Sequence, residues 1–428
     1  MSLPRLRSAL RRLACAGLAL AFAGAASAAG PKAYIGNFQD STVSVLDVGA
    51  ARVLATVPVA AGPDGLVVTP DGGTVFVSGS NAAELSVLDT ASDRVTGSIA
   101  VGHGPQGLAL TPDGRQLLVA VNGDDKLAFV DVASRRVAAT IDLPKPHTVA
   151  VQPGGRRAYV SSQQPGAFAL VIVDLAQRTV VGRIALDKPP RDLEFDHQGR
   201  ELFVTLAGVP AVQVVDPASD RIVGQVPTGV SPHLAQFYAG TPQGVAVVQG
   251  PGRLEFFDAA SRTVTRTVPV GPQPHWMDIT ADRHTLLVTN EGGNSVSLVD
   301  LGGAPTVEVS VGRAPRKVAV QQRAAAQGAA SGATNAAANG AGAAGEARVA
   351  IANFAFAPTP LTVAAGQRVT WRNDDGAPHG VAYADKSPGQ DLLLPGQQFS
   401  RRFDKPGVYD YICSVHPYMT GRVVVTAH

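Results

Sequence analysis

Short apolar segments separated by turn sequences repeat along most of this 428-residue chain. In residues 107–149, four such segments follow one another, and Pro112-Asp113-Gly114 and Asn122-Gly123-Asp124-Asp125 separate two of the pairs. Apolar runs of four to eight residues that are bounded by Gly, Pro, Asp and Asn are typical of β-strands. The pattern therefore predicts units of four short strands.

The units recur with a period of about 42 residues. An aspartate that closes a Val-rich segment occurs once per unit, at Asp47, Asp89, Asp131, Asp174, Asp216, Asp258 and Asp300. A proline just ahead of a short apolar segment keeps the same phase, at Pro63, Pro105, Pro146, Pro190, Pro232, Pro274 and Pro315. A repeat of roughly 40 residues with four strands predicts a blade of a β-propeller.

The two ends of the repeat region indicate how the ring closes. The region begins with three predicted strands, near Tyr34, Val43 and Val53, and ends with a lone one at residues 317–320. Pairing the last strand with the first three completes a seventh blade and removes an exposed strand edge. Residues 30–321 are therefore predicted to form a seven-bladed propeller.

These units resemble the YVTN family of bacterial propeller repeats. The resemblance rests on Ala33-Tyr34-Ile35-Gly36-Asn37, on Ala158-Tyr159-Val160-Ser161 and on the recurrent Thr-Pro-Asp-Gly sequence. It implies the fold and says little about function, because propellers support many unrelated activities.

The composition changes after the repeats. Residues 322–345 consist mainly of Ala, Gly, Ser, Asn and Gln without an apolar period, which predicts a flexible linker. Residues 346–428 then form a separate predicted domain that carries the chemistry. The expected class is all-β throughout, with the propeller followed by a Greek-key β-sandwich.

A Cys-x-x-His-x-x-Met run near the C-terminus places a thiolate, an imidazole and a thioether on one loop, as Cys413, His416 and Met419. Two histidines and a cysteine with a weak axial methionine are the ligands of blue-copper electron-transfer sites. His379, which follows a strand-like segment, is the natural second histidine. The sequence therefore predicts one type 1 copper site.

This last segment resembles the cupredoxins of the amicyanin and pseudoazurin kind. The resemblance rests on Phe354-Ala355-Phe356-Ala357-Pro358, on the Pro378-His379 pair and on the strand that leads to Cys413. It implies the ligands His379, Cys413, His416 and Met419, and an electron port formed by His416 with Pro417, Tyr418 and Pro378. The family often has Asn, Ser or Thr after its first histidine, where this chain has Gly380, so a backbone N–H is left to serve the sulfur.

The propeller offers a second set of candidate residues. The residue after each repeat proline is, in chain order, Asp64, Gln106, His147, Arg191, His233, His275 and Arg316. Equivalent positions in a ring of blades lie near one another at the central channel. His147, His233 and His275, with His103 close by in sequence, could hold a second metal or a ligand. The alternative is that they are ordinary polar residues of a hydrated channel.

The N-terminus indicates where the protein acts. Arg5, Arg7, Arg11 and Arg12 precede a short apolar run and a small-residue site at Ala26-Ser27-Ala28, so residues 1–29 are predicted to be a secretory signal. We expect export to a bacterial periplasm and no membrane span in the mature chain. A net charge of +2 without basic clusters argues against nucleic acid as a partner.

These features predict a periplasmic copper protein that carries single electrons, with the propeller as a platform for docking or ligand binding. Its partner would be a periplasmic redox protein, a cytochrome or a quinoprotein dehydrogenase, as donor or acceptor. One alternative is a copper-dependent oxidoreductase with a second metal at the propeller mouth. Another is copper storage or delivery.

Overall fold

The computed structural model describes residues 31–237, 243–322, 347–352, 355–374, 379–383, 387, 389–394, 396–414 and 419–427. The predicted signal segment and nearly all of the predicted linker lie outside these ranges. Among the described residues, no helix is long and apolar enough to cross a membrane.

Seven four-stranded antiparallel sheets form the first part of the described chain, as the repeat predicted. Each innermost strand contacts those of the two neighbouring sheets, so the sheets close a ring. The innermost strands are β4 (Pro63–Val68), β8 (Pro105–Leu110), β12 (Pro146–Val151), β16 (Pro190–Phe195), β20 (Pro232–Phe237), β24 (Pro274–Ile279) and β28 (Pro315–Val320).

The second strands are buried almost throughout, because neighbouring blades cover both of their faces. They are β1 (Lys32–Asn37), β5 (Thr74–Gly79), β9 (Gln116–Val121), β13 (Arg157–Ser162), β17 (Leu202–Leu206), β21 (Gln243–Val248) and β25 (Thr285–Asn290). This explains why their sequences read as continuous apolar runs.

The third strands end at the repeated aspartate. They are β2 (Thr42–Asp47), β6 (Glu84–Asp89), β10 (Lys126–Asp131), β14 (Ala169–Asp174), β18 (Ala211–Asp216), β22 (Arg253–Asp258) and β26 (Ser295–Asp300). The carboxylate accepts a backbone N–H from the following turn, for example from Ser92 to Asp89 at 2.8 Å and from Ser134 to Asp131 at 2.7 Å. The aspartate recurs because it closes the turn before the outer strand.

The outer strands are the most exposed. They are β3 (Arg52–Pro58), β7 (Arg94–Ala100), β11 (Arg136–Asp142), β15 (Thr179–Ala185), β19 (Arg221–Pro227), β23 (Thr263–Pro269) and β27 (Val307–Ser310). A single 3₁₀ turn in the described ranges, η1 (Asn122–Asp124), joins β9 to β10.

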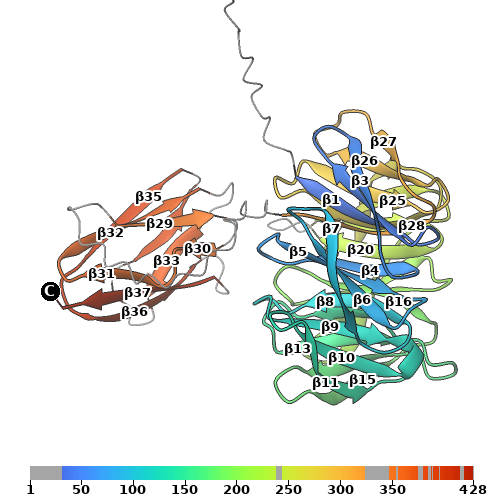
Figure 1. Cartoon of the computed structure of the whole chain (residues 1–428), viewed down its shortest axis with the longest axis horizontal. Coiled ribbons are helices and arrows are strands. Elements are labelled where there is room, and N and C mark those ends of the chain that lie inside the picture. Colours follow the sequence, from blue (N-terminus) through green and yellow to red (C-terminus); the bar gives the residue numbers. More distant parts are fainter. Residues whose placement is uncertain are drawn as a thin grey trace, which may run out of the picture.

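Strands from the two ends of the propeller sequence complete one blade. β28 pairs antiparallel with β1, with Ile35 opposite Val318, and the sheet order is β28-β1-β2-β3. β1 and β28 contact each other along their length, and Figure 1 labels both in the same part of the propeller. The predicted closure of the ring is therefore confirmed.

The C-terminal part is a β-sandwich of two sheets (Figure 1). One has the order β30 (Ala355–Ala357), β29 (Ala347–Ala352), β32 (Gln367–Asn373) and β35 (Gln398–Phe403). The other has the order β31 (Leu361–Ala364), β37 (Thr420–Thr426), β36 (Gly407–Ile412), β33 (His379–Tyr383) and β34 (Gln390–Leu393).

Both sheets contribute to one apolar core centred on the fully buried Trp371. The Trp371 indole meets the ring of Tyr411 edge to face, with centroids 5.4 Å apart. Such aromatic pairs add about 0.5–1.5 kcal/mol beyond the burial of their area. The predicted all-β class, a seven-bladed propeller followed by a cupredoxin, is confirmed.

Candidate metal centre and propeller channel

Three of the four predicted copper ligands lie at one end of the five-stranded sheet. His379 opens β33, Cys413 directly follows β36, and Met419 directly precedes β37. β36 is antiparallel to both of the other strands, so the start of β33, the end of β36 and the start of β37 meet at the same edge. The sheet topology therefore brings together residues that are 40 positions apart in sequence.

The thiol and the imidazole face each other in a buried pocket. Cys413 Sγ lies 3.6 Å from His379 Nδ1, and both residues are 0% exposed. Met419 is 3% exposed, and its carbonyl oxygen accepts the Cys413 N–H at 2.9 Å. This hydrogen bond closes the ligand loop and fixes the cysteine beside the methionine.

The donor set fits a transition metal. In zinc sites, metal bonds to sulfur and to imidazole nitrogen are about 2.3 and 2.0 Å, so one ion that binds both holds these atoms about 3.5–3.7 Å apart. The separation of 3.6 Å between Cys413 Sγ and His379 Nδ1 matches this span. Thiolate, imidazole and thioether together favour copper over the hard cations.

The cysteine sulfur accepts a hydrogen bond from the backbone at position 380, where glycine has no side chain that could donate one. The Gly380 N–H donates to Cys413 Sγ at 3.4 Å. Hydrogen bonds around a metal-ligating sulfur orient the ligand and tune the redox potential of the site. The chain therefore retains one such bond without the side chain that is common at this position in the resembled family.

The remaining ligand and the electron port fall outside the described residues. This applies to His416, and also to Pro417, Tyr418 and Pro378. Their roles stay predictions.

The predicted ring of residues in the propeller does assemble. A β-bulge follows each repeat proline, as the register shifts at Pro63, Pro146 and Pro274 illustrate. Bulges redirect side chains, and here the residue after the proline turns to the central channel. All seven such residues line one cavity of about 130 Å³: Asp64, Gln106, His147, Arg191, His233, His275 and Arg316.

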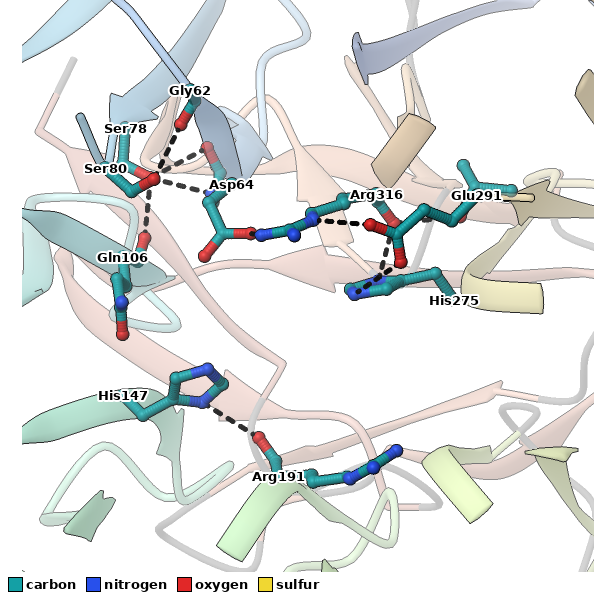
Figure 2. A network of polar contacts seen from close by, with 12 residues as sticks. Gly62, Asp64, Ser78, Ser80, Gln106, His147, Arg191, His275, Glu291 and Arg316 are labelled. Carbon is teal, nitrogen blue, oxygen red and sulfur yellow. Dashed lines mark hydrogen bonds and ion pairs between the residues drawn. The ribbon is translucent and has the colours of Figure 1, made fainter. Parts of the chain in front are cut away.

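Hydrogen bonds between blades hold this narrow chamber (Figure 2). The Arg316 guanidinium donates to Glu291 at 3.0 Å and to Asp64 at 3.2 Å, which ties three blades together. His147 Nδ1 lies 3.1 Å from the Arg191 carbonyl oxygen, and His275 Nδ1 lies 3.1 Å from that of Arg316. Since a carbonyl only accepts, both imidazoles carry their proton on Nδ1.

Burial keeps these histidines neutral. Desolvation lowers the pKa of His147, lowers that of His233 well below its usual value and lowers that of His275 to about 4. The rings of His233 and His275 lie 3.9 Å apart between centroids, and the buried Nδ1 of His233 has no hydrogen-bond partner among the described residues.

Two parts of the second-metal hypothesis do not agree with the structure. His103 does not belong to the chamber, because its side chain is 80% exposed and its Nδ1 pairs with Asp124 at 3.0 Å. Within the described propeller, no three His, Cys, Asp or Glu side chains are grouped to hold a metal ion. The His147, His233 and His275 ring thus shares a chamber without forming a ligand set.

A second, wider chamber of about 440 Å³ adjoins the first and was not predicted. Thr148, Trp276 and Lys317 line both cavities, while Asp192, Glu194 and Asp278 line only the wider one. The sequence signal was available, because charged residues two and four places after the repeat proline of an innermost strand point into the channel by strand alternation.

Burial shifts the titration of this acidic group. Desolvation raises the pKa of Glu194 to about 8 and that of Asp278 to about 6. It also raises the pKa of Asp192 and lowers that of Lys317, and the opposite charges of these two side chains counter both shifts.

Replacing Glu194 by glutamine is expected to stabilise the protein more at pH 8 than at pH 5. As the pH rises from about 4.5 to 8, the unfolded chain loses the Glu194 proton and the folded chain keeps it, so wild-type stability falls. Glutamine does not titrate in this range, so the variant does not lose this stability as the pH rises. Urea unfolding should show a gain that is larger at pH 8 by roughly 1–3 kcal/mol. The exposed Glu308→Gln serves as control, and an equal gain at both pH values would contradict the expectation.

Two family models match the chain. Residues 343–426 match "Copper binding proteins, plastocyanin/azurin family", and residues 14–111 match "YNCE-like beta-propeller". The first contains all four predicted copper ligands, and the second contains the first strands of the propeller.

Relatives match over the C-terminal domain. Amicyanin-alpha of Methylorubrum extorquens is 39% identical over 87 residues, which are 19% of this chain and 73% of the relative. Amicyanin of Paracoccus versutus is 33% identical over 82 residues, which are 18% of this chain and 62% of the relative.

Solved structures match over a larger share of the chain. Hydrazine synthase of Kuenenia stuttgartiensis superposes with a TM-score of 0.58 at 19% identity, covering 62% of this chain and 91% of that one. At this identity the likeness shows the fold alone.

Proposed function

Because the chain belongs, through its C-terminal domain, to the plastocyanin/azurin family of copper binding proteins, we propose that it is a type 1 copper protein that carries single electrons. The observation that carries the proposal is the buried contact of Cys413 Sγ with His379 Nδ1 at 3.6 Å, with the Gly380 N–H on the sulfur. Met419 and, by resemblance, His416 complete the ligand set. Bound copper would supply the one-electron couple between its two oxidation states.

The protein contributes rigidity and exclusion of water. His379 opens β33 and Cys413 directly follows the neighbouring strand β36, and the pairing of Ala382 with Ile412 holds these two strands together. The aromatic core around Trp371 packs directly against this end of the sandwich, since Cys413 and Met419 belong to the same cluster. A site held in this way changes little between oxidation states, which favours fast electron transfer.

The N-terminal sequence supports a proposal for the cellular setting. We propose that residues 1–29 direct export to the periplasm and that the partner is a periplasmic cytochrome or quinoprotein dehydrogenase. Electrons would pass through His416, within the surface formed by Pro417, Tyr418 and Pro378. The propeller would serve as the platform for a partner or a ligand.

Repeated oxidation and reduction is expected to leave the copper in place. Voltammetry of the full chain with one copper should show a reversible one-electron wave, and metal analysis after many cycles should still give one copper per chain. A storage or delivery protein would instead lose copper to a chelator when reduced. An irreversible wave with loss of copper would therefore contradict the carrier proposal.

A further inference from the structure

The wider propeller chamber has two unlike walls. Its volume of about 440 Å³ is within the usual range for small-molecule sites. The fifth residue of each innermost strand faces this chamber in all seven blades. These residues are aliphatic on four neighbouring strands of the ring, Val67, Ala109, Ala150 and Ala319, and polar on the other three, Glu194, Gln236 and Asp278. One half of the chamber is therefore apolar and the other half acidic.

The polar half has an excess of negative charge. Three carboxylates, those of Asp192, Glu194 and Asp278, face one cation, Lys317, among the described lining residues. Above the Glu194 pKa of about 8, all three carboxylates are ionised and outnumber the one cation. A low-dielectric chamber with uncompensated negative charge attracts cations.

Asp192 has one carboxylate oxygen without a hydrogen bond in the described part of the chain, although Lys317 counters its charge. The residue is 3% exposed, and its buried Oδ2 has no hydrogen-bond partner among the described residues. Asp278 differs, because the N–H groups of Val320 and Ile279 donate to it, each at 2.7 Å. Buried polar atoms are nearly always paired, so Asp192 indicates a missing partner.

The chamber suits an organic cation better than a metal ion. Its carboxylates are not grouped to hold an ion, since no such cluster of three occurs in the described residues. The Lys317 ammonium lies 2.9 Å from the centroid of the Trp276 ring. The chamber lining therefore already places one cationic amine against an aromatic ring. The opposite apolar wall would cover an alkyl body that a bare ion does not possess.

We propose that this chamber binds a small organic ammonium compound, with its charged group toward Asp192 and Glu194 and its apolar body along Val67, Ala109 and Ala150. The exposed Gln322, the first residue of the predicted linker, also lines this chamber. The ligand would thus enter from the face to which the copper domain is tethered. The inference does not rest on copper binding.

Calorimetric titration of the full chain with n-butylammonium at pH 9, where Glu194 is ionised and the amine is still charged, tests this inference. One equivalent per chain should bind, and uncharged n-butanol should bind at least about tenfold more weakly. Asp192→Asn and Glu194→Gln should each weaken n-butylammonium at least about tenfold. The exposed Asp187→Asn removes the same charge and should change nothing. Cys413→Ser should bind normally, which separates this inference from the copper proposal.

Several results would overturn the inference. Absence of binding up to about 10 mM would do so, as would equal binding of n-butanol or unchanged affinity in Asp192→Asn. Displacement of n-butylammonium by magnesium at equal concentration would point to a metal site instead. If a charge variant misfolds, Ala109→Phe is the alternative, because it narrows the chamber without changing its charge. It should weaken n-butylammonium binding, and unchanged binding would contradict the inference. Nuclear Overhauser contacts between the butyl chain and the methyl groups of Val67 and Ala109 can be sought in the wild-type protein, and contacts only elsewhere would refute the assignment.

Discussion

Replacing Cys413 by serine is expected to abolish the intense visible absorption of the copper-loaded protein and to lower copper affinity by more than about 100-fold. The thiolate is the softest ligand of the set and the source of the charge-transfer band. It is also the atom on which the His379 ring and the Gly380 N–H converge, at 3.6 and 3.4 Å. A hydroxyl retains neither the softness nor the negative charge. Metal analysis after desalting, together with an absorption spectrum, measures both effects.

Met419→Leu is the matched comparison for this variant. It removes a sulfur of similar burial from the same loop, but the axial ligand binds weakly. We therefore expect copper and colour to persist and the reduction potential to change. Equal loss of copper in both variants would indicate that the loop, and not the thiolate, holds the metal.

Placing an aspartate at Val318 is expected to destabilise the propeller by about 3–5 kcal/mol, because it buries an uncompensated charge. Val318 is 1% exposed and lies opposite Ile35 in the pairing that closes the ring. The change therefore acts on the strand pairing that joins the two ends of the propeller sequence. Urea unfolding should shift to lower concentration, and hydrogen exchange should accelerate in β1 and β28.

Val307→Asp provides the control in the adjacent blade. Val307 lies in the outer strand β27 and is 48% exposed, so the same substitution should cost less than about 0.5 kcal/mol. If both variants unfold alike, closure through β28 does not determine propeller stability.

The periodic features were predictable because each repeats a physical requirement. Asp89 and Asp131 recur because a carboxylate must close the turn after the third strand. Pro63 and its equivalents recur because the first residue of a strand tolerates a missing N–H. Because each feature occurs seven times, the sequence alone was enough to predict the fold and the closure of the ring.

The copper ligands were predictable from their types and their spacing. Cys413 and Met419 stand on one short loop, and β33 supplies His379 from the neighbouring strand. The sequence could not show that the Gly380 N–H reaches the sulfur, because this depends on the exact approach of two strands. The ligand set was therefore more predictable than the hydrogen bonds around it.

The propeller channel was predicted only in part. Its ring of residues after the prolines was identified, but which side chains converge depends on the bulges and on pairing between blades. His103, close in sequence, turns outward to Asp124. Asp192 and Glu194, both in β16, were overlooked although strand alternation directs both into the channel.

The visible spectrum of the full chain loaded with one equivalent of Cu(II) tests the central claim most directly. The account predicts an intense band near about 600 nm, with the Cys413 thiol protected from alkylation. A colourless protein whose thiol reacts freely in the presence of copper would contradict it.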